Sequence, residues 1–306
     1  MPLIRLRDLL DFFTIATLLP FAWFLPQTSW PKFCNTLGRL HVALLKHRNS
    51  RLDKLLLSQG LDLDSKELEV RFRTENYYEL LYTLREYKGV SQDTNIILTG
   101  EHHLKEALEQ GSGAVLWLAS LVHSELIIHK CLYWADLPAH FLSSREHGFQ
   151  SPTKFGQSFL NPIKSRMETR YLSERHVMSE GKVGEAIRAM IDQLHDNGII
   201  SIMAVNTGRR VGKTELLGGS LCLAKGAPNI AITNHAPLLP LFAVRKNNGN
   251  FEVNIKPPLK IISSDVEKAE QEMIDQFGNY LEDYLKEYPE HWRGWFGQGT
   301  LWHPKA

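Results

Sequence analysis

The sequence predicts an α/β fold in which a mixed, largely parallel sheet is covered by helices. Short apolar runs, typical of buried strands, alternate along the chain with longer amphipathic segments, typical of helices. Glycine and proline residues mark many of the boundaries between them. The 306 residues, 43% of them hydrophobic, suffice for a substantial core. In such folds, reactive side chains are expected where the strands end.

The N-terminal residues predict a hydrophobic helix at a membrane. The uncharged run 12–26 is shorter than the roughly 20 apolar residues that a full span needs, and Pro20 interrupts it. No small-residue cleavage site follows the run. We therefore predict a membrane anchor or a shallow insertion over residues 1–30 and one domain over 31–306. The alternative is that the segment is a core helix or a hydrophobic cap on the domain.

The remaining elements are predicted in chain order. Apolar residues spaced three and four apart favour helices from residue 30 to about 85. Strands are expected at 95–100, 114–120, 139–144, 199–205, 229–236, 237–246 and 251–259. Helices are expected at 101–113, 121–138, 180–198, 220–228 and 266–289, with a loop over 207–219.

Charge and cysteine content exclude some classes of function. The net charge of +1 comes from 35 basic and 34 acidic residues, so no overall field attracts nucleic acid, and we expect no nucleic-acid partner. Cys34, Cys131 and Cys222 are odd in number and widely spaced. They therefore indicate neither a disulfide framework nor a zinc site.

Several motifs follow one another in an order known from one family. A GxG turn at Gly111 and Gly113 precedes a buried strand and then Glu125. SSREHGFQSP, LLGG and the ending YPEHWRGWFGQGTLWHP come later, after an apolar N-terminus. In order and spacing, from about residue 9 to 302, the chain resembles the bacterial lipid A biosynthesis acyltransferase family of lauroyl and myristoyl transferases. The resemblance implies a glycerolipid acyltransferase-like fold.

The resemblance also implies a catalytic site, with two departures from the family's pattern. The family's general-base histidine aligns with Ser120, five residues before the carboxylate at Glu125, and its strand-end aspartate aligns with Asn206. An unassisted serine hydroxyl is a poor proton acceptor at neutral pH. The hypothesis is therefore that His123 is the replacement base, with Glu125 as its partner and Ser120 in the site. Helical spacing, however, makes Glu125 a more natural neighbour of His129.

Simpler interpretations of these residues stay open. His123 could be an ordinary hydrogen-bonded residue of a first helical turn, and Ser120 an N-cap. Arg145, Arg209 and Asn206 are candidate substrate-binding residues. The two arginines would bind an anionic part of a substrate, and a surface ion pair explains Arg145 equally well. The stretch 208–214, GRRVGKT, is too short between its glycines for a phosphate-binding P-loop, so we do not expect nucleotide hydrolysis.

The leading functional hypothesis is a membrane-associated acyltransferase. It would move a fatty acyl group from an acyl-carrier-protein or acyl-CoA thioester to a lipid or glycolipid hydroxyl, without a metal or another cofactor. The resemblance implies the cytoplasmic face of the inner membrane of a Gram-negative bacterium. The rival hypothesis is a non-catalytic homologue that acts as a lipid-binding or scaffolding protein.

Overall fold

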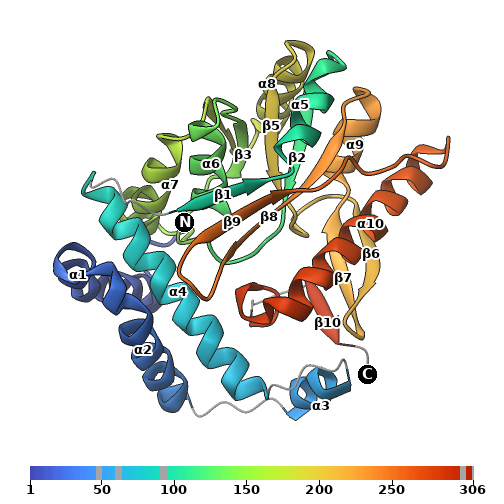
Figure 1. Ribbon diagram of the computed structural model, residues 1–306. Helices are drawn as coiled ribbons and strands as arrows, with labels where there is room; N and C mark the ends of the chain where they lie inside the picture. Colours follow the sequence, from blue (N-terminus) through green and yellow to red (C-terminus); the bar gives the residue numbers. More distant parts are fainter. Residues whose placement is uncertain (46–49, 59–63, 90–94, 297–300, 305–306) are drawn as a thin grey trace.

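The computed structural model describes residues 1–45, 50–58, 64–89, 95–296 and 301–304 (Figure 1). The helices are α1 Leu6–Phe24, α2 Trp30–Leu45, α3 Ser50–Ser58, α4 Ser65–Tyr87, α5 Glu101–Glu109, α6 Ser124–Trp134, α7 Asn161–Thr169, α8 Val183–His195, α9 Gly226–Thr233 and α10 Val266–Glu287. The strands are β1 Ile96–Thr99, β2 Ala114–Leu118, β3 His140–Ser144, β4 Glu174–Met178, β5 Ile199–Met203, β6 Val211–Leu216, β7 Gly219–Ala224, β8 Leu238–Arg245, β9 Phe251–Ile255 and β10 Trp302–Pro304. Three short helical turns complete them, η1 Gln27–Ser29, η2 Gly156–Leu160 and η3 Pro289–His291.

The described strands form one large sheet and one small sheet. The large sheet has the order β1-β9-β8-β2-β5-β3-β4 and the small one β10-β7-β6. β8, β2, β5, β3 and β4 run parallel, while β9 is antiparallel to β8 and parallel to β1. The predicted mixed, largely parallel sheet covered by helices is therefore confirmed. The parallel strands bring their carboxyl ends to one edge of the sheet, which we call the carboxyl edge.

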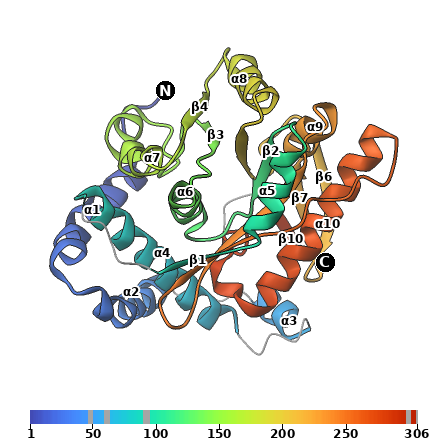
Figure 2. The ribbon, with the colours of Figure 1, turned by 45° about the horizontal axis from the view of Figure 1, so that its top comes forward.

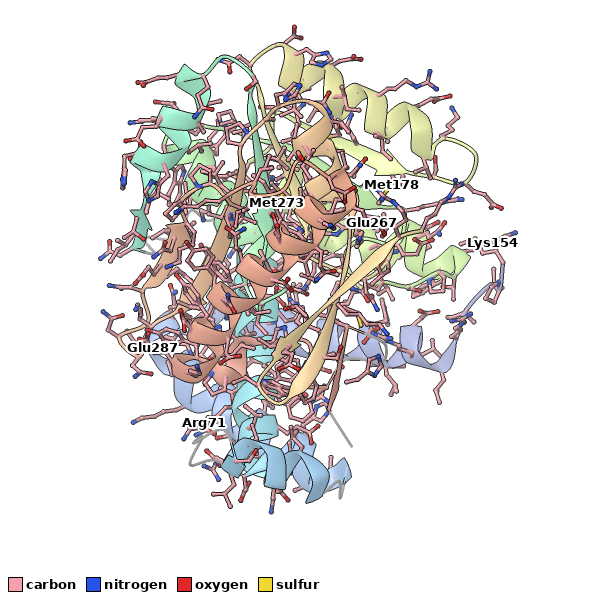
Figure 3. The ribbon with its side chains drawn as sticks, turned by 90° about the vertical axis from the view of Figure 1, so that its right-hand side faces the viewer. Arg71, Lys154, Met178, Glu267, Met273 and Glu287 are labelled. Atoms are coloured by element: carbon pink, nitrogen blue, oxygen red, sulfur yellow. The ribbon has the colours of Figure 1, made fainter. Side chains whose placement is uncertain are left out.

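Each face of the large sheet is covered by its own apolar core. Along β2, Val115 and Trp117 pack with α8, α9 and α10, whereas Leu116 and Leu118 pack with α1, α4 and α6. This alternation is what the period of two along a strand requires. Figure 3 looks onto the first face, with α10, which carries the labelled Met273, in front of the strands.

One stretch of the prediction is wrong. Residues 220–228 were expected to be a helix and 229–236 a strand, but β7 occupies 219–224 and α9 occupies 226–233. The predicted loop 207–219 also contains most of β6, which pairs with β7 from Val211↔Ala224 to Leu216↔Gly219. A short apolar run fits a buried strand or a buried helix equally well. Residues 219–224 form a strand because they pair with β6 and β10.

Besides β6, three elements were missed, namely β4, α7 and the short strand β10. The β4 sequence ERHVM is largely polar, because β4 is the edge strand of the large sheet and is only partly buried. A strand of this kind lacks the continuous apolar signal of the central strands. α7 lies beside α4 and α6, on the same side of the sheet (Figure 2).

The predicted N-terminal helix is present, and it lies against the domain. α1 packs on α4 through Ile15, Leu18 and Ala22 (Figures 1 and 2). Near its start, the buried Asp8 carboxylate accepts hydrogen bonds from Ser151 Oγ at 2.5 Å and from Thr153 Oγ1 at 2.8 Å. Among the described residues, no helix has both the length and the apolar character to cross a membrane. The assignment of residues 1–30 as an anchor stays a prediction.

Candidate functional site at the carboxyl edge

The loop after β2 brings Ser120 to the carboxyl edge, beside the C-terminal segment of the chain. The Ser120 carbonyl accepts a hydrogen bond from the Arg293 amide at 3.3 Å, and Leu121 forms an antiparallel bridge with Trp292. α6 begins only at Ser124, so the interpretation of Ser120 as an N-cap is wrong. The N-cap is His123, which adopts a left-handed backbone conformation with φ of 73°.

This conformation directs His123 away from solvent and toward α4. The imidazole is 1% exposed, and its Nε2 lies 3.0 Å from Oε2 of Glu75. Arg245, at the carboxyl end of β8, binds the same carboxylate with both Nε, at 2.8 Å, and Nη2. His123, Glu75 and Arg245 thus form a buried network, which we call the His123 network.

The charges in the His123 network explain its stability. Burial alone would raise the pKa of Glu75, but the hydrogen bonds from His123 and Arg245 hold it far below its usual range. Burial lowers the pKa of His123 despite the nearby carboxylate, so a neutral imidazole donates its Nε2 proton to Glu75. The network therefore joins α4, the N-terminus of α6 and β8.

Glu125 lies in a second polar group. One oxygen of Glu125, one ring nitrogen of His147 and one oxygen of Glu168 lie within 4.8 Å of one another. His147, from the loop after β3, hydrogen-bonds Glu168 of α7 through Nε2. His147 and Glu168 are buried, whereas Glu125 is half-buried. We call these three residues the Glu125 cluster.

Cationic side chains surround the Glu125 cluster. The fields of Glu125 and Glu168 act on both Arg175 and Arg293. Arg293 also binds Glu79 at 2.8 Å, and Lys164 binds Glu79 at 3.0 Å. Positive charges therefore lie close to the carboxylates of the Glu125 cluster.

His147 has the electrostatic setting of a proton-transfer group. Burial disfavours its charged form, but the carboxylates of Glu168 and then Glu125 outweigh burial and raise the pKa of His147. The hydrogen bond from Nε2 to Glu168 fixes the orientation of the ring and leaves Nδ1 as the nitrogen that can accept a proton from a substrate. A histidine oriented by a carboxylate is the usual arrangement of a general base.

The predicted anion-binding residues are spread along the carboxyl edge. Arg145 directly follows β3 and is exposed, and Arg209 is exposed in the loop after β5. Asn206, in that loop, is half-buried, and its backbone carbonyl accepts a hydrogen bond from the Gly208 amide at 3.0 Å. The residues Gly212, Lys213 and Thr214 of GRRVGKT lie within β6, so the stretch is no P-loop.

Sequence reasoning missed the partners of His123, and it missed both His147 and its partner Glu168. Glu75 lies in the segment 30–85, for which only helices were predicted, and its pairing with Arg245 joins residues 170 positions apart. His147 belongs to the REHG stretch after β3, and its position directly beyond a strand was the signal that could have found it. Glu168 lies on the helix that was missed, so no pattern pointed to it.

Comparison with known proteins identifies the family. Residues 83–298, more than half of the chain, match the family model described as bacterial lipid A biosynthesis acyltransferase. The chain belongs to this family. No curated protein matched the chain in a sequence search. The region matched to the acyltransferase family contains Ser120 and the whole Glu125 cluster, but it excludes α1 and Glu75. Membership implies an acyl donor and a lipid acceptor in general terms.

Proposed function

We propose that this protein transfers a fatty acyl group from an acyl-carrier-protein or acyl-CoA thioester to the hydroxyl of a lipid or glycolipid. The observation that carries the proposal is the Glu125 cluster. It places a carboxylate-bound histidine beside the family's carboxylate position, within the part of the chain that matches the family. Lipid A or a related glycolipid is the acceptor class that fits best.

In the proposed reaction, His147 takes over the role that the sequence assigned to His123. His147 accepts the proton of the acceptor hydroxyl, Glu168 holds the imidazole, and Glu125 stabilises the imidazolium that forms. The acceptor oxygen then attacks the thioester carbon, and the thiol leaves with a proton. No side chain caps the first turn of α6, and we assign stabilisation of the oxyanion to the backbone amides of this turn other than that of Ser124, which donates to the Leu121 carbonyl. Ser120, at the same carboxyl edge, is assigned to this site as well.

The anionic parts of the substrates are assigned to the same edge. Arg145 and Arg209 are exposed there and are proposed to bind the phosphate groups of a lipid or of the acyl carrier, with Asn206 nearby. The reaction as proposed requires no cofactor besides the acyl-donor substrate.

We further propose that the protein works at the cytoplasmic face of the inner membrane of a Gram-negative bacterium. The outer face of the N-terminal segment supports contact with lipid. Leu6, Leu10 and Phe13 of α1 are 74%, 60% and 62% exposed, and Phe24 is 77% exposed. A contiguous group of exposed large apolar side chains is typical of an interaction surface, and a helix of this type can lie in the membrane interface.

Exchanging two of these side chains should weaken membrane binding. Burying one leucine or phenylalanine side chain contributes about 1.5–3 kcal/mol, so we expect Leu10→Ser/Phe13→Ser to bind about a hundredfold less tightly. Co-sedimentation with vesicles of phosphatidylethanolamine and phosphatidylglycerol measures this. The matched control is Ile262→Ser, because Ile262 is 77% exposed but lies just before α10. Equal binding of both variants would contradict the membrane assignment of α1.

Lipid mass spectrometry tests the proposed reaction directly. We expect a deletion strain to accumulate a lipid that lacks one acyl chain, and the wild-type gene to restore the full product. The mass difference gives the acyl chain length, and the lipid itself gives the acceptor. An unchanged lipid profile in the deletion strain would contradict acyl transfer.

The second candidate is a non-catalytic lipid-binding or scaffolding protein. The enclosure of His123 in its network favours this alternative, because the histidine nearest the family's catalytic position is then unavailable to substrate. A deletion strain with unchanged lipids, combined with vesicle binding by the wild-type protein, is the result expected for this candidate.

A further inference from the structure

We propose that His140, Glu174 and His176 bind a divalent transition-metal ion, with Zn²⁺ the best match. His140 and Glu174 are the first residues of β3 and β4, at the edge of the sheet opposite to the Glu125 cluster, and His176 lies two residues further along β4. Four residues of β3 separate His140 from the carboxyl edge, roughly 13 Å in an extended strand. The inference is therefore independent of the proposed acyl transfer.

The strand register places all three side chains on one face of the sheet. β3 and β4 are parallel, with His140 opposite Glu174 and Leu142 opposite His176. Register partners point to the same face, and so do residues two apart on one strand. Arg175, between the two β4 residues, points to the other face, where its Nε donates to Ser143 Oγ at 2.8 Å.

The distances between the donor atoms suit a single small ion. Nδ1 of His140 lies 3.2 Å from Nε2 of His176, which lies 3.6 Å from Oε2 of Glu174. All three donor atoms lie within 4.8 Å of one another. Tetrahedral Zn²⁺, with bonds of about 2.0–2.2 Å, holds neighbouring ligand atoms about 3.3–3.5 Å apart. Only small side-chain movements separate the observed geometry from such a site.

The electrostatics also favour this group over the two other His/Glu groups. In the His123 network, Arg245 already binds Glu75, and the carboxylates of the Glu125 cluster lie in the electrostatic fields of Arg175 and Arg293. In the part of the chain that the structure describes, no lysine or arginine forms a salt bridge with Glu174, whose recorded ionic partner is His176.

The site is also accessible from solvent. The Glu174 side chain is 62% exposed and His140 is half-buried, whereas His176 is buried and fixed. An ion can therefore enter from solvent and take water as its fourth ligand. A bound ion would link the edge strand β4 to β3 and so stabilise this side of the sheet. Figure 2 shows β3 and β4 side by side, near α8.

Isothermal titration of the full-length protein, with any polyhistidine tag removed and after EDTA treatment, tests the site with Zn²⁺. We expect one ion per chain, and affinity at least tenfold weaker in His140→Ala and His176→Ala. His195→Ala is the matched control, because His195 is exposed at the end of α8. His140→Gln and circular dichroism of every variant separate loss of a ligand from loss of the fold. Replacing Zn²⁺ by Co²⁺ should give the visible absorption of a tetrahedral site.

Two results would overturn the proposal. One is the absence of stoichiometric Zn²⁺ binding by the wild-type protein. His140 and His176 would then interact only through the direct hydrogen bond between their imidazoles. The other is Zn²⁺ binding that survives His140→Ala and His176→Ala but is lost in His147→Ala, which would place the ion in the Glu125 cluster.

Discussion

Replacing His147 with alanine is expected to lower the rate of acyl transfer by about 10²–10⁴-fold, the usual contribution of a general base. The change removes the proposed proton acceptor and leaves Glu125 and Glu168 in place. The measurement is incorporation of a labelled acyl group, from the acyl-carrier-protein or CoA thioester, into lipid extracted from the deletion strain. Glu125→Gln should also lower the rate of acyl transfer, because the His147 imidazolium then has one stabilising carboxylate in place of two.

Two further variants decide between His147 and His123. His102→Ala, at an exposed histidine of α5, is the control and should retain wild-type activity. His123→Gln keeps a donor for Glu75 and should also retain its rate in the folded fraction. If His123→Gln is inactive while His147→Ala is active, His123 is the base and the assignment of His147 is wrong. If the wild-type protein itself is inactive, the proposed function fails instead.

The pH dependence of the wild-type rate follows from the same residue. A base must be neutral to accept a proton, and Glu168 and Glu125 raise the pKa of His147 despite its burial. The rate should therefore rise with pH and reach its plateau above the ordinary histidine pKa of about 6.5. A plateau already reached below that pH would contradict the role of His147.

Arg245→Met is expected to lower the free energy of unfolding by about 3–5 kcal/mol, the cost of leaving a buried charge without its partner. The side chains of Arg245 and Glu75 are only 10% and 8% exposed, so water cannot replace the lost interaction. Urea denaturation followed by circular dichroism measures the change. A loss below about 1 kcal/mol would mean that the network contributes no more than a surface ion pair.

The double variant Glu75→Gln/Arg245→Met is the matched control. It removes both charges, so it should recover much of the stability lost in the single variant. The pKa of Glu75 is depressed in the folded protein, so its contribution is present above its unfolded pKa of about 4.5 and is lost as the pH falls below that value. The double variant should lack this part of the acid sensitivity.

Most of the large sheet could be predicted from sequence. β2, β5 and β8 are buried on both faces, so their apolar runs are continuous, and glycine or proline residues precede them. β4 and the region of β6, β7 and α9 were missed or wrong. Their structure depends on edge position and on strand pairing, which local periodicity does not report.

The sequence by itself determined the family, the fold class and the position of Glu125 just beyond a buried strand, because these depend on local hydrophobic patterns and on the order of the motifs. Only the tertiary structure decided the partners. The left-handed conformation of His123 sends its ring to Glu75, 48 residues earlier, while Glu125 meets His147 and Glu168. Contacts between distant elements depend on how helices and strands pack together, and a pattern of neighbouring residues does not predict that packing.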